Sequence, residues 1–358
     1  MKESAIAFIV SMLLLTACSK DNDETVTVET PTGVATVTYL VTPNGLGDNS
    51  YNDAAAEGIF AFAHVTGTRL RMLQPKDEAE AGTMYRQWLT DNATKDSAVL
   101  IIGSSAYEAI ARQTSAAEQD RLQSLKERGG RVLLFESDAD IEGISTVIIS
   151  RYGVSYLAGA MSQNFNALVM SAVKDNPLLD EAISGFLAGY DAHHAEGTAA
   201  EVFYLSDGVA GFAMPDSAYH FMASKIAQKF VFRDMVFPLL GGSGIGVLRA
   251  MNDEEANLGL VIGSDVDQSV LCSRVPFSMI IQIGEVLHRY LDDWKAGREW
   301  PSHQRLGMNE GGADLMLHPS FYTNNPALDD RYRDPETFQR LYDMYKEEAM
   351  KKEEAYEK

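Results

Sequence analysis

The loop at residues 45–52 (GLGDNSYN) carries side chains that could bind a small polar molecule. Its glycines let the backbone come close to a ligand, Asp48 and Asn52 supply directional hydrogen-bonding groups, and Tyr51 supplies a flat ring. The alternative is a capped helix start in which Asp48 or Ser50 is the N-cap.

Two later loops have similar properties. Residues 241–246 (GGSGIG) could be taken for a dinucleotide fingerprint, but their glycine spacing is G-x-G-x-G rather than G-x-G-x-x-G. A strand-to-helix loop that presents Gly242 to a ligand fits better. Residues 263–268 (GSDVDQ) place Asp265 after a predicted strand, where its carboxylate can accept hydrogen bonds from two sugar hydroxyls. The alternative is an exposed turn, and the rest of an EF-hand calcium loop is missing.

Signals for catalysis or metal binding are weak. Ser155 and Ser243 have small neighbours, but the sequence has no G-x-S-x-G elbow. His193, His194 and Glu196 form a loose cluster, and H-E-x-x-H is absent. We therefore expect no catalytic residue, no cofactor, no metal site and no enzymatic activity. A catalytic triad assembled in space stays open, because sequence order does not reveal one.

Strand and helix patterns alternate along most of the chain. In the first half, β-branched and apolar runs predict strands at residues 34–41, 69–73, 97–102, 131–135 and 146–149, with helices at 52–64, 78–89, 106–113 and 116–128. In the second half the predicted helices are 154–164, 178–190, 218–229 and 247–252, and the predicted strands are 167–173, 201–205, 235–240 and 258–262. Further on we predict a long helix at 276–294, a strand at 310–317 and a helix that starts after the N-cap Asp334 and runs to about 353. This alternation predicts an α/β fold of two consecutive, mostly parallel, doubly wound halves.

The charge balance excludes some classes of partner. The 358 residues include 51 Asp and Glu against 30 Lys and Arg, a net charge of −21. A track of phosphate contacts on a nucleic-acid polymer needs clustered cations, and so does adhesion to anionic lipid. We expect neither, so a link to a membrane would be covalent or a spanning helix.

The N-terminal segment predicts export. Lys2 precedes an apolar run of about eleven residues, shorter than the roughly 20 that span a bilayer, as in a signal peptide. The run ends in Leu-Thr-Ala-Cys18, which resembles a bacterial lipobox, so residues 1–17 would be removed and Cys18 lipidated. Alternatives are an ordinary signal peptide and a buried helix. Residues 18–33 are predicted to be a polar tether. Cys272 is then a lone cysteine, predicted to be buried.

Four segments in order resemble the basic membrane protein family of bacterial lipoproteins, which are type I solute-binding proteins of ABC importers. Residues 47–52 (GDNSYN) resemble the family's Asp and Ser-Phe-Asn motif, and residues 151–160 (RYGVSYLAGA) resemble its interlobe helix start. Residues 236–247 (VFPLLGGSGIGV) and 261–268 (VIGSDVDQ) resemble its Gly-Gly-Thr-Gly-x-Gly-Val and Val-Ile-Gly-Val-Asp-x-Asp-Gln motifs.

This resemblance implies two Rossmann-like lobes with a ligand cleft between them. Residues 34–150 would form the first lobe, completed by about 275–320, and residues 151–270 the second. Residues 321–358 would form a C-terminal extension with a helix. Several family members bind purine nucleosides, so the resemblance implies a nucleoside or related polar solute as ligand, an ABC permease as partner, and a lipid-anchored location in the bacterial cell envelope.

The resemblance also implies individual ligand contacts. The candidates are Asp48, Tyr51, Asn52, Ser104, Phe212, Gly242 and Asp265. Asp48 and Asn52 would face the edge of the base, with Tyr51 stacked on it and Phe212 as the opposing aromatic ring. Asp265 would accept hydrogen bonds from the ribose hydroxyls.

The sequence departs from the family at two places. The family's Lys after the Asp265 motif is missing, and Arg274 is the nearest cation. The loop that contains Ser104 is short, and whether Glu108 replaces the family's Asp is open. The sequence therefore predicts a small polar solute as the ligand and leaves its chemical identity open. Two other functions also stay open: a capture lipoprotein without a permease, and an exported enzyme on a Rossmann-like scaffold.

Overall fold

The computed structural model describes residues 35–42, 45–103, 105–228, 234–253, 259–325, 334 and 336–356. The predicted signal peptide, the tether, the predicted lipid attachment site Cys18 and the predicted ligand contact Ser104 lie outside these residues.

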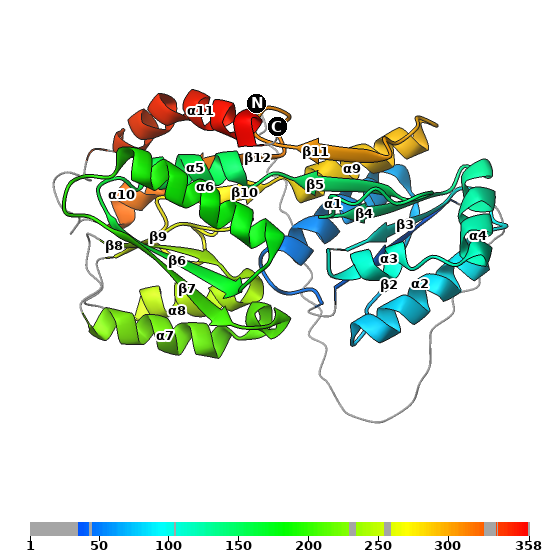
Figure 1. Cartoon of the computed structure of the whole chain (residues 1–358), viewed down its shortest axis with the longest axis horizontal. Coiled ribbons are helices and arrows are strands. Elements are labelled where there is room, and N and C mark those ends of the chain that lie inside the picture. The colour runs from blue at the N-terminus through cyan, green and yellow to red at the C-terminus, as the bar shows by residue number, and fades with distance from the viewer. Residues whose placement is uncertain are drawn as a thin grey trace, which may run out of the picture. The chain divides into compact units, whose positions relative to one another are not determined.

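The first half of the chain forms a six-stranded sheet in the order β11-β5-β4-β3-β1-β2, and each pair of neighbouring strands is parallel (Figure 1). The strands are β1 (Thr36–Leu40), β2 (Arg69–Leu73), β3 (Ala98–Ile102), β4 (Arg131–Phe135), β5 (Ser145–Ile149) and, from much later in the chain, β11 (His303–Leu306). The central strands are continuous apolar runs because both faces of the sheet are covered.

Helices pack on the two faces of this sheet, and the alternation of side chains along β3 shows it. Val99 and Ile101 belong to one hydrophobic cluster with Phe62 of α1, whereas Leu100 belongs to another with Trp88 of α2. The helices of this part are α1 (Tyr51–Thr66), α2 (Glu78–Asn92), the single turn η1 (Ser105–Tyr107), α3 (Glu108–Arg112), α4 (Ala116–Glu127) and α9 (Ile283–Lys295), which packs against α1. We call the six-stranded sheet and these helices the first lobe.

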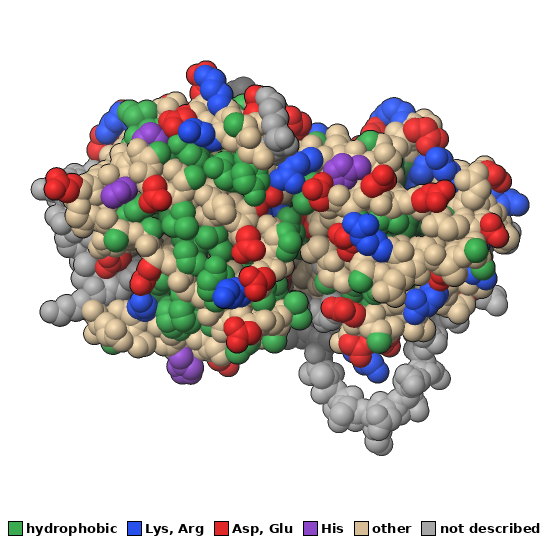
Figure 2. Space-filling view, in the orientation of Figure 1, with side chains coloured by type: hydrophobic (Ala, Val, Ile, Leu, Met, Phe, Trp, Pro, Cys, Tyr) green, Lys and Arg blue, Asp and Glu red, His purple; other side chains and the backbone are tan. Residues whose placement is uncertain are grey.

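The second half forms a four-stranded parallel sheet in the order β7-β6-β8-β9. Its strands are β6 (Asn166–Val173), β7 (Ala200–Ser206), β8 (Asp234–Leu239) and β9 (Leu260–Val261), and its helical elements are α5 (Tyr152–Met161), α6 (Pro177–His193), η2 (Val209–Ala213), α7 (Pro215–Ala227), η3 (Gly241–Ser243) and α8 (Gly244–Asp253). β7 is an edge strand, and Figure 2 shows hydrophobic side chains gathered on the face that carries α6 and β7. We call this sheet, its helices and the strand pair β10–β12 the second lobe.

The region predicted as one helix at residues 276–294 is a strand followed by a helix, so that prediction is wrong. β10 (Phe277–Ile281) pairs antiparallel with β12 (Ala313–Leu317), and Ser278 bridges to Gly263 next to β9. The helix α9 begins only at Ile283. The residues before this helix, FSMII, form a short apolar run that fits either a buried strand or the start of the helix. Because α9 has a strong 3.6-residue apolar period, the sequence pattern favours the helix.

The chain passes between the two lobes at three places. The first crossing joins β5 to α5, the second joins β10 to α9, and the third joins β11 to β12. Crossings of this kind connect two lobes that are not continuous in the sequence. The predicted α/β class with two Rossmann-like lobes is confirmed.

The C-terminal part packs on the second lobe. Beyond α10 (Ser320–Asn324), α11 (Thr337–Tyr356) lies along α5 (Figure 1). Cys272 is 1% exposed and has a free thiol, which confirms the predicted burial. Among the described helices, none is long and apolar enough to cross a membrane.

Candidate functional site

The candidate site lies at the carboxyl ends of the parallel strands in the first lobe. Strand order places β5, β4, β3 and β1 side by side, so the residues that follow them share one edge of the sheet. Such an edge is the usual ligand crevice of open α/β sheets. The 45–52 loop follows β1, Glu136 follows β4, and Arg151 follows β5 at the first crossing.

Asp48 stabilises the start of α1. Its carboxylate accepts hydrogen bonds from the backbone N–H groups of Ser50 (3.0 Å), Asn52 (3.0 Å) and Asp53 (3.2 Å), and from Nδ2 of Asn52 (3.0 Å). Asp53 in turn accepts from the N–H groups of Gly47 and Asn49 at 2.7 and 2.8 Å. Burial raises the pKa of Asp48, against the effect of its backbone hydrogen bonds. The loop is therefore held in one conformation by its own carboxylates.

Asn52 and Tyr51 occupy the first turn of α1. The Asn52 side chain is buried and donates to Asp48, and its Oδ1 accepts from Oγ1 of Thr42 at 3.0 Å. The Tyr51 ring packs against Phe135 with a centroid separation of 5.6 Å. Asn52 therefore reaches a ligand only by giving up these bonds, whereas Tyr51 presents a ring supported from behind.

Arg151 is the cation of the site, and sequence analysis did not identify it as a ligand contact. Its side chain is 7% exposed, and Nη1 donates to Oε2 of Glu136 at 2.6 Å and to the Ile149 carbonyl at 3.1 Å. Burial lowers the pKa of Arg151, but the charges of Glu136 and then Asp265 outweigh it and raise the pKa. The guanidinium therefore stays protonated beside two carboxylates.

Three buried polar atoms near the ends of β1 and β4 and at the start of α1 lack a hydrogen-bond partner within the described structure. The hydroxyls of Tyr39 and Tyr51 and Oε1 of Glu136 have no hydrogen-bond partner among the described residues. Burial raises the pKa of Glu136, and the charge of Arg151 opposes this increase. The nearby Tyr51 hydroxyl also opposes it, although the hydroxyl and Glu136 do not meet the geometry of a hydrogen bond. Burial likewise raises the pKa of Tyr51, and the charge of Glu136 adds to it. Buried polar groups are normally hydrogen-bonded, so each of these atoms could accept or donate a bond to a ligand.

Asp265 faces this cluster from the second lobe. Ser50 Oγ donates to its Oδ2 at 2.5 Å, so the two lobes touch here. The surrounding residues 263–268 are fixed from behind: Oε1 of Gln268 accepts from the Ser264 N–H at 3.0 Å, and the Asp265 carbonyl accepts from the Ile281 N–H at 3.0 Å. A ligand hydroxyl would replace Ser50 at Asp265, which requires the lobes to separate first.

Gly242 and Phe212 complete the face of the second lobe. A Cβ on Gly242 would lie 3.5 Å from Cβ of Asp48, so this glycine keeps the backbone close to the first lobe. The buried hydroxyl of Ser243 donates to the Gly211 carbonyl at 2.7 Å and accepts from the Met214 N–H at 2.6 Å. Ser243 therefore joins the Phe212 loop to the Gly242 loop.

The structure thus brings the described predicted contacts into one region, where Asp48 lies near Gly242 and Ser50 bonds to Asp265. It adds Arg151 and Glu136, which meet only because the end of β4 lies beside the first crossing. Glu108 instead pairs with Arg112 and accepts from Ser137, each at 2.7 Å.

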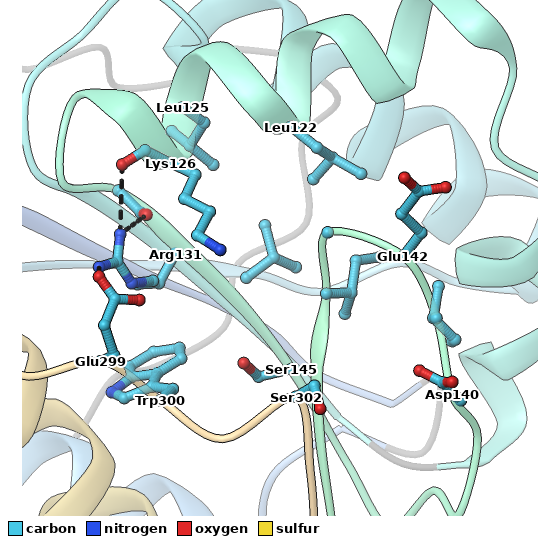
Figure 3. Close-up of a pocket in the computed structure, with 15 residues that line it drawn as sticks. Leu122, Leu125, Lys126, Arg131, Asp140, Glu142, Ser145, Glu299, Trp300 and Ser302 are labelled. Atoms are coloured by element: carbon cyan, nitrogen blue, oxygen red, sulfur yellow. Dashed lines mark hydrogen bonds and ion pairs between the residues drawn. The ribbon is translucent and has the colours of Figure 1, made fainter.

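A separate cavity of about 170 Å³ lies at the opposite edge of the first lobe (Figure 3). It is lined by α4 and by the beginnings of β4 and β5, the far ends of the strands from Glu136 and Arg151. In it Arg131 donates to Glu299 at 2.7 Å and to the Lys126 and Gly130 carbonyls. This cavity is not part of the candidate site. The described residues contain no group of three or more His, Cys, Asp or Glu placed to hold a metal.

Comparison with known proteins identifies the fold. No family model and no curated protein matches the sequence. Solved structures do match. A solute-binding protein of an ABC transporter system from Aeropyrum pernix K1 is 15% identical, with a TM-score of 0.65 over 90% of each chain. A transcriptional activator of the comK gene from Bacillus halodurans is 15% identical, with a TM-score of 0.62 over 87% of this chain and 97% of that one. A sugar ABC transporter protein from Yersinia enterocolitica is 13% identical, with a TM-score of 0.59 over 88% of this chain and 96% of that one. The chain therefore has the type I periplasmic-binding-protein fold.

Proposed function

We propose that this chain is a solute-binding protein that captures a small, neutral, hydroxyl-bearing solute between its two lobes for an ABC-type importer. The observation that carries the proposal is Arg151, held by Glu136 beside Asp265, with Asp265 bonded to Ser50 of the opposite lobe. Planar charged groups fixed in this way can read the positions of ligand hydroxyls. Two of the three structures named above are described as ABC transporter proteins, which supports this role.

Within that role we propose a purine nucleoside as the ligand. Asp265 and Arg151 suit ribose hydroxyls, and the Tyr51 and Phe212 rings belong to the loops that meet at the same region. An aromatic ring can stack on a flat base. The resemblance of the four sequence motifs to the basic membrane protein family supports the same ligand. A free sugar is the competing ligand, because the Yersinia protein is described as a sugar transporter.

We also propose that Cys18 carries a lipid that anchors the protein in the bacterial cell envelope. The support is the lipobox-like Leu-Thr-Ala-Cys18 and the polar tether that follows it. Fractionation of cells that express either the natural chain or Cys18→Ala tests this: the natural chain should follow the membrane and the variant should not. Equal membrane fractions would contradict the anchor.

The ligand proposal is tested by the melting temperature of the purified chain with millimolar nucleosides, free bases, pentoses and hexoses. A ligand with micromolar affinity raises the melting temperature, because it binds only the folded state. We expect a purine nucleoside to do so. If sugars alone stabilise the protein, the nucleoside is wrong and the solute-binding role stands. If no compound does, the role itself is contradicted.

Asp265→Asn tests the assigned residue. Loss of a charged acceptor should lower the affinity for the ligand roughly 10- to 150-fold, as expected for hydrogen bonds to a charged group. Asp267→Asn is the matched control, because Asp267 is exposed and contacts Ser269 and His318, neither of which is a predicted ligand contact. Affinity of the Asp265 variant within threefold of the natural chain would show that Asp265 does not hold the ligand.

A further inference from the structure

The end of α11 contacts two of the three crossings between the lobes through one buried carboxylate. Glu353 is 2% exposed although it lies on a helix rich in charged residues. Its Oε1 accepts from the Gly153 N–H at 3.2 Å, next to the first crossing, and its Oε2 accepts from the Met308 N–H at 2.7 Å, in the third. One side chain therefore joins two segments that are far apart in the sequence.

Glycines on both crossings make room for this carboxylate. A Cβ on Gly153 would lie 2.8 Å from Cδ of Glu353, and a Cβ on Gly307 would overlap Oε2 of Glu353. A larger residue at either position would displace the carboxylate. The seat of Glu353 is therefore shaped by both crossings, and is not a chance contact at the surface.

The rest of α11 is fixed on the second lobe. Phe338 packs against Phe277 of β10 with a centroid separation of 5.4 Å, and Lys346 donates to Asp314 of β12 at 2.6 Å. At the other end, the Tyr356 ring stacks on Tyr152 at 4.1 Å. The helix thus packs on the second lobe and contacts the crossings with its C-terminal end.

A second carboxylate joins the first crossing to β11, the strand that precedes the third crossing, and leads into the ligand site. Glu181 of α6 accepts from the N–H groups of Arg151 and Tyr152 at 2.7 and 3.1 Å, and Arg305 of β11 donates to it at 2.7 Å. Arg151 therefore has its backbone in the hinge and its side chain in the candidate site. Any change in the bend of the first crossing moves this guanidinium.

We propose that α11 is a hinge clasp in which Glu353 holds the first and third crossings together and so favours the closed arrangement of the lobes. Hinge closure absorbs its rotation in a few residues between domains, and these are the residues that Glu353 fixes. The effect on ligand affinity rests on the proposed function; the effect on the lobes does not. Without the clasp, the lobes sample wider openings, and a ligand binds more weakly because the competent state is less populated.

The test measures the distance between the lobes without any ligand. Spin labels are placed at Val65→Cys and Val270→Cys, which are 76% and 82% exposed on α1 and on the second lobe, in a chain with Cys18→Ser. Buried Cys272 is shielded from the label. Double electron–electron resonance then measures the distance distribution between the two labels in the doubly labelled chain and in its Glu353→Ala and Glu353→Gln variants. Glu347→Ala is the matched control, because Glu347 is exposed and, among the described residues, forms its ion pair with Lys351 of the same helix.

We expect Glu353→Ala to broaden the distance distribution and move it to longer distances, Glu353→Gln to do so less, and Glu347→Ala to leave it unchanged. Once a ligand is identified, Glu353→Ala should lower the affinity for it roughly 2- to 10-fold, about the effect of one hydrogen bond. The proposal would be overturned if Glu353→Ala exchanged the amide protons of Gly153 and Met308 faster but kept the same distance distribution between the labels as the chain with Glu353. If Glu353→Ala does not fold, Gly307→Ala crowds the same seat and must broaden the distribution; a natural distribution there also overturns it.

Discussion

The cleft and the hinge of this protein both contain buried glutamates, but their hydrogen bonding differs. Glu136 in the cleft and Glu353 at the hinge are each 2% exposed, and Glu181 at the hinge is 6% exposed. Both oxygens of Glu181 and of Glu353 accept hydrogen bonds. In Glu136 one oxygen binds Arg151 and the other has no hydrogen-bond partner within the described structure. A buried acceptor left unpaired costs about 1–3 kcal/mol.

Backbone conformation separates the two regions in the same way. Glu136 and Asp265 both have positive φ angles, 60° and 67°, which L-residues adopt rarely. Such strain, when it is observed, is concentrated at functional sites because the surrounding structure must hold it in place. The hinge is therefore a completed network, and the cleft is an incomplete one that a ligand can complete.

The largest expected effect is on stability, at the cation of the cleft. Arg151→Met should lower the free energy of unfolding by about 3–5 kcal/mol, because it leaves a buried carboxylate without its cation. Arg305→Met is the matched hinge variant and should cost about 1.5–3 kcal/mol, because Glu181 keeps three other donors. Urea denaturation of both variants measures the difference. Equal losses would show that cleft and hinge do not differ in how well their carboxylates are paired.

A smaller effect is expected from pH at His318, behind Asp265. Nε2 of His318 lies 2.9 Å from Oγ of Ser278. Burial lowers the pKa of His318, and Asp267 offsets this only in part. Below about pH 6.5 the unfolded chain takes up a proton that the folded state resists. The free energy of unfolding should therefore fall with decreasing pH, from this group by at most about 1.4 kcal/mol per pH unit.

Denaturation at a series of pH values checks this. His318→Asn should flatten the slope of unfolding free energy against pH below pH 6.5. A slope that persists in His318→Asn would assign the pH dependence to other groups and leave His318 without this role.

The smallest expected effect has the opposite sign. Tyr51→Phe removes a buried hydroxyl that has no hydrogen-bond partner in the described part of the chain, so stability should stay within about 0.5 kcal/mol or rise. Tyr190→Phe removes a buried hydroxyl that donates to the Phe165 carbonyl at 2.6 Å, and should cost about 1 kcal/mol. Thermal denaturation compares the two variants, and ligand affinity should fall only in Tyr51→Phe. A stability loss in Tyr51→Phe as large as in Tyr190→Phe would mean that its hydroxyl is already satisfied.

Much of the fold was predictable because its strands are short, apolar and bounded by glycine or turn residues. The predictions at 69–73 and 131–135 match β2 and β4 residue for residue. The strand at Phe277–Ile281 was missed because a run of five mostly buried residues carries no period of its own next to a strongly amphipathic helix. Its conformation is determined by its pairing with β12 on one side and with residues 263–265 on the other.

The site was predictable in part, for a related reason. Loops rich in glycine and acids mark strand ends in the sequence, and this identified Asp48, Gly242 and Asp265. Arg151 and Glu136 lie in ordinary-looking sequence, and their importance comes from a contact between the end of β4 and the first crossing. No local pattern encodes that contact.

By itself, the sequence determined the alternation of strands and helices and the glycine-rich loops at strand ends, and the anchor at Cys18 stays a prediction from it. These depend on local chemistry: side-chain period, backbone freedom and the residue types in a short segment. The tertiary structure alone decided which buried charges are paired and which are not, and that Glu353 meets Gly153 and Gly307. The physical reason is that burial and pairing are properties of contacts between distant segments, formed only when the chain has crossed between its lobes.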